Sequence, residues 1–349
     1  MAEAYYYQRL PKLHQKVYHA LYTGLQAVAA SISVPRLEGR ELAEIYFQIR
    51  LDHPEIFYTV SFKWQFAQDA SHVEILPEYL FPKAKVEEHR KALAARVQKL
   101  ARPAAALPEW EKEAYIHDFV CRNVRYDKLK KPYSHEILGP LGQGVGVCEG
   151  IAKSVKILCD ALGIWCMVAV SESNPERGIK YRHAWNIVKL GGQYYHLDCT
   201  FDNTLGRDGP IRYDYFNLSD SHLFRDHQQP VWPLPACPDS GKSWYREKKL
   251  SFTRMEDVAK RAAQAIRKKQ VLVFHWRGGY LTREVLAQLL GVCAADAQKK
   301  QLYPHLALNW PQAVMQLQFV PQQPAEQVTV QEANEGEQEE TAVCPEANK

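Results

Sequence analysis

Hydrophobic residues recur along the middle of the chain first with a helical period and then with a strand-like period. After Cys148, apolar residues return at the spacing of one face of an α-helix, and Gly163 supplies a C-terminal stop. The apolar face consists of Ile151, Val155, Leu158 and Leu162. The pattern therefore predicts a helix that carries Cys148 in its first turn.

Three strand-like runs follow this helix. They are WCMVAV at 165–170, HAWNIVKL at 183–190 and QYYHLDCTF at 193–201. Gly191 and Gly192 join the last two runs, which is a strong signal for a β-hairpin. A further helix is expected from about Glu109 to Tyr126, ahead of the glycine-rich stretch GQGVG that leads to Cys148.

The regions on either side follow other patterns. Residues 5–52 read mostly as helix with an interruption around SISVPRLEG, and 56–66 alternate as a half-buried strand with HVEIL as its candidate partner. A charged helix is expected at 83–101, and the RPAAALP that follows has the composition of a linker. From about 250 onward, a basic helix, VLVFHW, another helix and VMQLQF predict a small α/β unit.

These patterns together predict an α+β fold with more than one domain. A chain of 349 residues with 46% hydrophobic and 24% charged residues can bury more than one core. The expected division is a helix-rich α+β domain at 1–105, a central core at 106–232, an accessory α/β domain at 233–324 and an acidic, disordered tail at 325–349. Seven acids and one base give this tail a net charge of −6 and leave +10 on the rest.

Composition also argues against several kinds of partner. No run of about eighteen apolar residues appears, and the first residues lack the order of a signal peptide, so we expect a cytoplasmic protein without a membrane partner. The basic pieces KLKK and RKK are short and far apart, which argues against nucleic-acid binding. The eight cysteines form no CxxC pair and no zinc-like cluster, so we expect reduced thiols, no metal and no cofactor.

Cys148 is the first candidate for chemistry. In the first turn of a helix, a thiol faces the positive end of the helix dipole and backbone amides without an intrahelical acceptor, and both favour the thiolate. The glycines before it allow a sharp turn and a close approach of the backbone. A buried cysteine is more often a small core residue, so the position alone leaves catalysis and packing open.

A thiolate nucleophile needs a base, and the predicted hairpin offers a base together with an acid to orient it. His183 opens the first strand and Asp198 lies on its antiparallel neighbour, where a short hairpin can place the two on one face. His196 competes as the base, but it is better interpreted as a neighbour in the pocket or a packing residue. Asp202 is the second choice as orienting acid, because it lies past the apparent strand end.

Three motifs resemble those of the transglutaminase-like, papain-related superfamily in the branch common among bacterial proteins. They are GVCEG at 146–150, HAWN at 183–186 and YHLDCTFDN at 195–203, and the resemblance covers roughly 106–220. It implies a papain/transglutaminase-like core, in which the helix bearing the cysteine packs on an antiparallel sheet. It also implies Cys148 as nucleophile, His183 as general base and then acid, and Asp198 as the residue that holds the imidazole. The family's oxyanion hole usually includes the nucleophile's own amide, and Gln143 is a candidate side-chain donor.

The resemblance implies cysteine-dependent acyl transfer on a protein or peptide substrate. Our first hypothesis is hydrolysis of peptide or isopeptide-type amides, because water is always available as acceptor and no feature marks an amine site. A protein-glutamine transglutaminase or deamidase and a non-catalytic scaffold are the alternatives. The sequence has no acidic cluster at calcium-loop spacing and no CxxC pair, so neither calcium nor the zinc of peptide N-glycanases is implied. The oligomeric state is left open.

Overall fold

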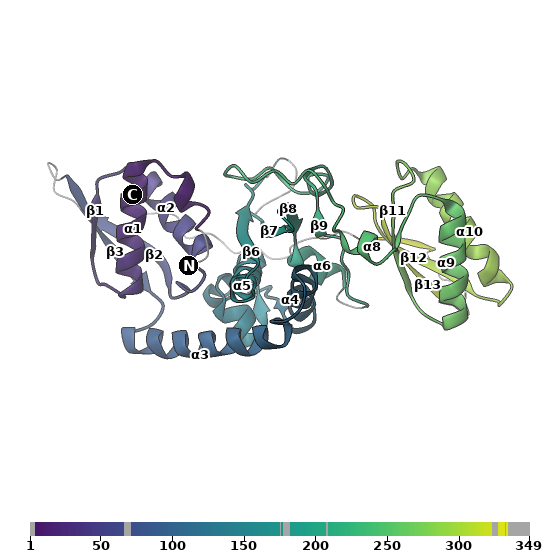
Figure 1. The fold of residues 1–349 in the computed structure, drawn as a ribbon, viewed down its shortest axis with the longest axis horizontal. Helices are drawn as coiled ribbons and strands as arrows, with labels where there is room; N and C mark the ends of the chain where they lie inside the picture. The colour runs from purple at the N-terminus through teal and green to yellow at the C-terminus, as the bar shows by residue number, and fades with distance from the viewer. Residues whose placement is uncertain are drawn as a thin grey trace.

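The computed structural model describes residues 4–65, 71–174, 176, 182–206, 209–322, 327–331 and 333. These residues form an α+β fold, as the sequence predicts, in three units that lie in a row (Figure 1). The main sheets of the three units have three, four and five strands. A single hydrophobic core runs from the helices of the first unit into the second, so the predicted domain boundaries stay predictions.

The first unit packs two helices on a three-stranded antiparallel sheet of order β1-β3-β2. Its elements are a 3-10 turn (Tyr7–Arg9), α1 (Lys12–Gln26), β1 (Ile32–Pro35), α2 (Gly39–Asp52), β2 (Thr59–Gln65) and β3 (His72–Tyr79). The predicted pairing of 56–66 with HVEIL is confirmed, although Phe66 lies outside the described residues. The predicted helical region with an interruption around SISVPRLEG is confirmed, and part of the interruption is the strand β1, in which Ile32 and Val34 are buried.

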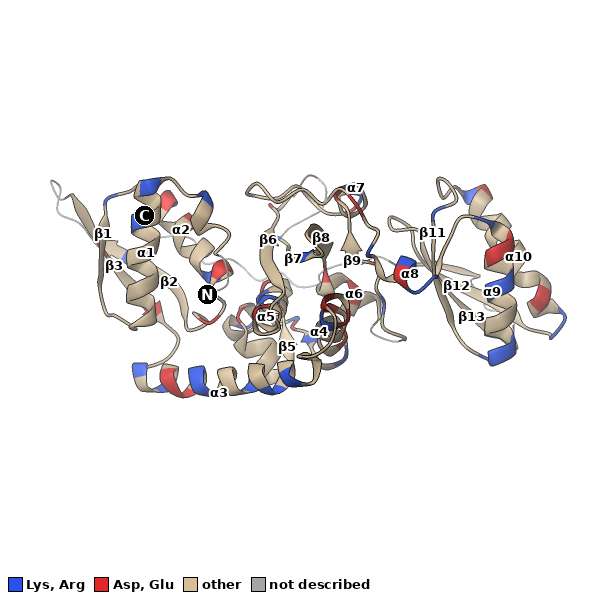
Figure 2. Cartoon of the chain, viewed as in Figure 1, with Lys and Arg blue, Asp and Glu red and all other residues tan. Residues whose placement is uncertain are grey.

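A long helix, α3 (Lys83–Ala101), connects the first unit to the second and has the predicted bounds (Figure 1). Residues of both charge signs follow one another along it (Figure 2), whereas Val86, Leu93 and Val97 are buried. The expected linker begins with a 3-10 turn, Arg102–Ala104. Within the described part of the chain, neither α3 nor any other helix combines the length and apolar character needed to cross a membrane.

The second unit places one buried helix against a four-stranded antiparallel sheet of order β6-β7-β8-β9. Before the sheet come α4 (Glu109–Asn123), β4 (Arg125–Tyr126), a 3-10 turn (Pro132–His135), a π-helical turn (Leu138–Gln143), β5 (Val145–Gly146) and α5 (Cys148–Ala161). The sheet consists of β6 (Trp165–Val170), β7 (Ala184–Leu190), β8 (Gln193–Leu197) and β9 (Phe216–Leu218), with α6 (Cys199–Leu205) after β8.

The amide of Asn186 fixes α5 to this sheet. Its Nδ2 donates to the carbonyl oxygen of Ala152 on α5 (2.9 Å) and to that of Met167 on β6 (3.2 Å). A buried amide with satisfied donors holds neighbouring elements at a defined distance. The predicted papain/transglutaminase-like arrangement, a cysteine-bearing helix packed on an antiparallel sheet, is therefore what the structure has.

The third unit is an α/β layer with its own core. After the short helices α7 (Asp220–Leu223) and α8 (Trp244–Glu247) come β10 (Ser251–Phe252), α9 (Met255–Lys268), β11 (Leu272–Trp276), α10 (Arg283–Gln298), β12 (Tyr303–Asn309), β13 (Val314–Val320) and β14 (Val328–Val330). The sheet order is β10-β11-β13-β12-β14. Disorder throughout 325–349 is wrong for β14, which pairs in parallel with β12; most of the predicted tail lies outside the described residues.

Candidate active site

Cys148 is the first residue of α5, as the sequence predicts. The chain reaches it through β5, which pairs in parallel with β4, and through the extended residue Val147. The side chain of Cys148 is buried, with 7% of its surface exposed. Its thiol therefore lies at a helix N-terminus, where amides without an intrahelical acceptor and the helix dipole favour a negative charge.

Two glycines allow this approach. A Cβ atom on Gly150, in the first turn of α5, would lie 2.2 Å from the carbonyl oxygen of Ser134, and one on Gly146 would lie 2.6 Å from the ring of Pro140. No side chain fits at such distances from a backbone carbonyl or from a rigid proline ring. The glycines in GVCEG are thus required because the start of α5 packs directly on the turns before it.

A buried cluster of charges stands next to the cysteine, and sequence patterns gave no signal for it. Lys153 Nζ donates to Glu136 Oε1 (2.8 Å) and to Glu149 Oε1 (2.6 Å), and Glu149 directly follows Cys148. Arg50, on α2 of the first unit, binds Glu136 and lies 3.6 Å from Glu149. Burial would raise the pKa of Glu149, but Lys153, His135 and Arg50 hold it well below its ordinary value. The first unit therefore contributes a charge to the surroundings of α5.

His183 immediately precedes β7 and binds Asp198. The distance from His183 Nε2 to Asp198 Oδ2 is 2.6 Å, and both side chains are buried. Ala184, the next residue, belongs to the same buried cluster as Cys148. The ring of His183 packs against Phe201 (centroids 4.6 Å apart) and stacks on Trp185 (5.9 Å). The structure thus joins two of the three predicted triad residues directly and places the third in the adjoining cluster.

Asp198 is not part of β8, contrary to the prediction of a strand over 193–201. β8 ends at Leu197, and Asp198 is the N-cap of α6: its Oδ1 accepts from the amides of Thr200 (2.8 Å) and Phe201 (3.1 Å). Aspartate is a strong N-cap, and this local bond ends the strand. Burial would raise the pKa of Asp198, but the charge of His183 and the bonds from His183 and His227 hold it well below its ordinary value.

A second histidine on Asp198 was missed by sequence analysis. His227 lies after α7, and its Nε2 is 2.9 Å from the Oδ2 atom that also binds His183. Its Nδ1 is 2.9 Å from Asp226 Oδ1. No spacing rule links residue 227 to the motifs, because only the tertiary fold brings the loop after α7 behind Asp198. Two histidines therefore share one carboxylate oxygen.

The two competing residues have other partners. His196 accepts a hydrogen bond from the indole Nε1 of Trp185 (3.1 Å) and binds Asp220 Oδ1 (2.8 Å), so its ring nitrogens are used by residues other than the predicted triad. Asp202 binds His117 Nε2 (3.0 Å) and the amides of residues 214 and 215 instead of His183. Burial raises the pKa of Asp202 to about 6. Of the two candidate acids, Asp198 is therefore the one that His183 binds.

Among the residues that the structure describes, two groups of side chains have donor atoms close enough to hold a metal ion, but the hydrogen bonds of their histidines account for this proximity. They are His183, Asp198 and His227, and His196, Asp220 and Cys237. The indole of Trp185 only donates, so the proton of His196 resides on the nitrogen that faces Asp220. Both nitrogens of His227 face carboxylate oxygens and act as donors. Neither histidine presents a lone pair to a metal in this arrangement.

Within the described ranges, the structure gives Gln143 and the other cysteines no further part in the candidate site. Gln143 ends the π-helical turn and is exposed, so its role as an oxyanion donor stays a prediction. The cysteines among the described residues are all free thiols, and Cys344 lies outside them. Burial raises the pKa of Cys199 and of Cys237, which fits the interpretation of Cys199 as a core residue.

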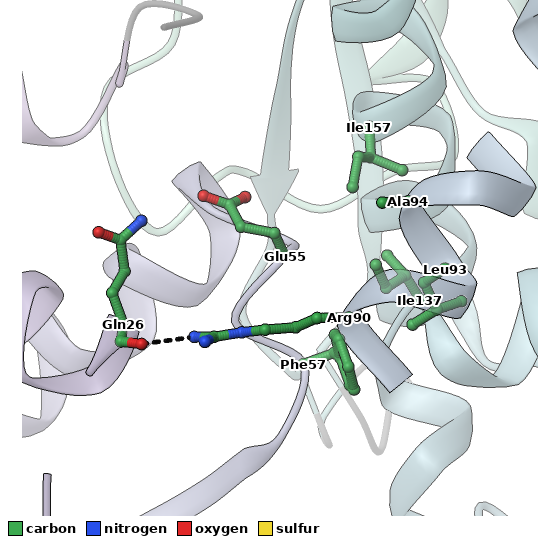
Figure 3. A pocket seen from close by; sticks show the side chains of 8 residues that line it. All are labelled: Gln26, Glu55, Phe57, Arg90, Leu93, Ala94, Ile137 and Ile157. Atoms are coloured by element: carbon green, nitrogen blue, oxygen red, sulfur yellow. Dashed lines mark hydrogen bonds between the residues drawn. The ribbon is translucent and has the colours of Figure 1, made fainter. Parts of the chain in front are cut away.

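A large cavity lies away from these residues (Figure 3). It has a volume of about 430 Å³ and is formed between the first unit, α3 and α5. Arg90 of α3 spans one side, where its Nη2 donates to the carbonyl oxygen of Gln26 (2.8 Å), and Ile157 lines the side of α5. Ile157 is nine residues after Cys148, or about 13 Å along a helix. The cavity is therefore separate from the candidate site.

Residues 91–199 match the family model of the transglutaminase-like superfamily. The chain carries a transglutaminase-like domain. The matched segment begins within α3 and contains Cys148, His183 and Asp198. The predicted resemblance is thereby confirmed at the level of the superfamily, and the match says nothing of the first 90 residues or of the third unit.

Solved structures similar to part of this chain include a TGase (12% identity, 41% of this chain and 44% of that chain, TM-score 0.27). Others are a candidate cysteine protease from Cytophaga hutchinsonii (17%, 40% and 62%, TM-score 0.26) and a candidate protease from Parabacteroides distasonis (15%, 40% and 36%, TM-score 0.24). The chain spans less than two thirds of the length of each. Comparison with curated proteins gave no match.

Proposed function

We propose that the transglutaminase-like domain is a cysteine-dependent acyl-transfer enzyme that hydrolyses peptide or isopeptide-type amide bonds of a protein or peptide substrate. The observation that supports this most strongly is the buried bond of 2.6 Å between His183 Nε2 and Asp198 Oδ2, next to a cluster that contains a thiol at a helix N-terminus. A histidine oriented by a carboxylate beside a cysteine is the arrangement that activates a thiol.

The bond to Asp198 determines which nitrogen handles the proton. Because Nε2 of His183 donates to Asp198, proton exchange with Cys148 runs through Nδ1. His183 takes the thiol proton, and the Cys148 sulfur forms a bond to the carbonyl carbon of the substrate. The tetrahedral intermediate then expels the amine, which leaves with the proton from His183 Nδ1. The product of this half-reaction is a thioester on Cys148.

Hydrolysis of the thioester uses the same groups in reverse roles. His183 Nδ1 removes a proton from water, the hydroxide attacks the thioester carbon, and the Cys148 sulfur departs with its electrons and regains a proton from His183. In both steps the carbonyl oxygen develops negative charge, and the backbone amide of Cys148 at the start of α5 is our proposed donor to it. Asp198 stabilises the imidazolium throughout.

The test is the pH dependence of iodoacetamide alkylation at Cys148, followed by peptide mass spectrometry, in wild type and in His183→Gln. The account predicts labelling well below pH 8, the range of a free thiol, and at least tenfold slower labelling in the variant. Cys237 is an internal control, because it is buried and burial raises the pKa of its thiol. If Cys148 labels no faster than Cys237, or labels equally in His183→Gln, the proposed function is wrong.

A further inference from the structure

His227 binds the same oxygen of Asp198 as His183 does, at 2.9 Å against 2.6 Å. It is 6% exposed, and its backbone amide donates to the carbonyl oxygen of Leu223 (3.1 Å). Its ring is 5.2 Å from the ring of His183, centroid to centroid, in an edge-on arrangement. Phe201 packs against both rings, at 4.6 Å from His183 and 4.5 Å from His227. The two imidazoles and Asp198 thus form one buried group.

The hydrogen bonds define the protonation of His227. Its Nε2 faces Asp198 Oδ2 (2.9 Å) and its Nδ1 faces Asp226 Oδ1 (2.9 Å). Ionised carboxylates only accept, so each ring nitrogen carries a proton and the ring is an imidazolium. The other titratable groups near it are His183, Tyr215, whose ring is 5.5 Å away, and His196, whose pKa is lowered by burial and, to a smaller extent, by the charge of His227. Burial alone would lower the pKa of His227, but its bonds to Asp198 and Asp226 outweigh burial and raise it.

We propose that His227 is a positioning residue for the Cys148–His183 pair: as a cation on the same oxygen of Asp198 that His183 binds, it sets the pH range over which His183 keeps its proton. This inference rests on the proposed function. It adds a fourth residue to the predicted triad and places charges of alternating sign in the order His183, Asp198, His227, Asp226.

A residue of the third unit, Gln312, binds Asp226, the second carboxylate partner of His227. Asp226 Oδ2 accepts from the hydroxyl of Tyr215 (2.7 Å) and from Nε2 of Gln312 (3.1 Å). Gln312 lies in the turn between β12 and β13, and the same Nε2 also donates to the carbonyl oxygen of His222 (3.2 Å). The accessory unit therefore fixes Asp226, which fixes His227, which in turn fixes Asp198.

The charge of His227 has a predictable effect on His183. A cation about 5 Å away disfavours a second cation, and it also takes up part of the negative charge of Asp198. Replacing His227 by a neutral residue leaves the full carboxylate charge to His183 and removes the repulsion. His183 then binds its proton more tightly, so the pH at which the imidazolium is lost moves upward.

The experiment measures the pH profile of Cys148 alkylation in wild type, His227→Gln and Asp226→Asn. Glutamine retains a donor for Asp198 but has no charge, and we expect the alkaline midpoint of the His183-dependent labelling to rise by about one pH unit. Asp226→Asn keeps His227 and removes one of its two carboxylates, so we expect a smaller shift in the same direction. His196→Gln is the matched control: it is an equally buried histidine bonded to Trp185 and Asp220, and the profile should not change.

The outcomes separate this inference from the proposed function. An unchanged midpoint in folded His227→Gln, or an equal shift in His196→Gln, overturns the role of His227 while the proposed function stands. If His227→Gln fails to fold, Asp226→Asn decides, and an unchanged midpoint there overturns the inference. Absence of low-pH labelling in wild type contradicts the proposed function itself, and the inference falls with it.

Discussion

Arg50 on α2 and Glu136 in the turns before α5 form an ion pair that is buried between the first and second units. Arg50 Nε donates to Glu136 Oε1 (3.1 Å), and Lys153 of α5 binds the same oxygen (2.8 Å). The side chain of Glu136 is fully buried and that of Arg50 is 12% exposed. One carboxylate thus compensates two buried cations, one from the first unit and one, Lys153, that lies five residues after Cys148 on α5.

Removing that carboxylate should be costly. In Glu136→Gln, Arg50 and Lys153 lose a charge partner that water cannot replace, so we expect the free energy of unfolding to fall by about 3 kcal/mol. Urea denaturation measures this change. The matched control is Glu44→Gln, which breaks the exposed pair with Arg40 and should change stability by less than about 0.5 kcal/mol. Equal effects of the two substitutions would contradict a stabilising role for the buried pair.

The close contact between Gly150 and Ser134 gives a second prediction. Gly150→Ala places a methyl group 2.2 Å from the carbonyl oxygen of Ser134, so the first turn of α5 must move and Cys148 with it. We expect a lower melting temperature and at least tenfold slower alkylation of Cys148. Gly291→Ala is the control, because Gly291 lies within α10 with open space around its Cβ position. There we expect stability to be retained or to rise, by about 1 kcal/mol at most.

Glu113 predicts a pH dependence of stability. It is fully buried on α4, and burial raises its pKa to about 8, against which the bond from Asn217 acts only in part. Between the ordinary pKa of a glutamate and pH 8, the folded chain binds more protons than the unfolded chain, so this group lowers stability as pH rises. In Glu113→Gln the loss is absent. The variant should match wild type near pH 4 and be more stable, by a few kcal/mol, at pH 8.

Thermal or urea unfolding at a series of pH values tests the effect of Glu113. The informative quantity is the difference between wild type and variant, because other groups contribute to both. Glu111→Gln changes an exposed residue on the same helix and is the control for loss of a carboxylate that is not buried. A constant difference for Glu113→Gln would show that Glu113 is ionised in the fold at neutral pH.

Substitution of Asp198 should reduce the reactivity of Cys148 even where the cap of α6 is retained. Asp198→Asn can still cap α6, but it removes the charge that holds the His183 imidazolium. We expect alkylation of Cys148 below pH 8 to slow by at least about a hundredfold, and stability to fall by about 3 kcal/mol because buried His227 also loses a charge partner. Asp202→Asn, at the acid bonded to His117, controls for loss of a buried carboxylate nearby. If both variants slow labelling equally, Asp198 has no special relation to the thiol.

Local sequence patterns predicted the elements that carry the site because those elements depend on short-range periodicity. The bounds of α3 and β6 agree with the prediction, and α5 begins at Cys148. Short-range patterns gave wrong or incomplete predictions where a side-chain hydrogen bond ends an element or where a strand forms by pairing with a distant segment. The cap formed by Asp198 ends β8 four residues early, and β1 and β14 form only because β3 and β12 offer an edge.

The residues that surround the candidate site could be identified only from the folded structure. Arg50 is 98 residues from Cys148 in sequence, and His227 is 29 residues from Asp198, so no motif connects them. What could have drawn attention to His227 is its place in the DH pair at 226–227, where an acid sits beside a histidine, but such pairs are common on protein surfaces. His227 is charged because its two ring nitrogens face the carboxylates of Asp198 and Asp226, and only tertiary packing brings Asp198 to it.

The most direct test of acyl transfer is to look for the thioester itself. Wild type is mixed with 4-nitrophenyl acetate, an activated ester, and nitrophenolate release is followed while intact-protein and peptide mass spectrometry locate the acetyl group. The account predicts a burst of about one nitrophenolate per chain, acetylation of Cys148 and steady turnover by water, all lost in Cys148→Ala and greatly slowed in His183→Gln. Acetyl transfer to an added primary amine in place of water would indicate a transglutaminase instead. No acetyl group on Cys148, or equal acetylation of Cys237, would contradict the central claim.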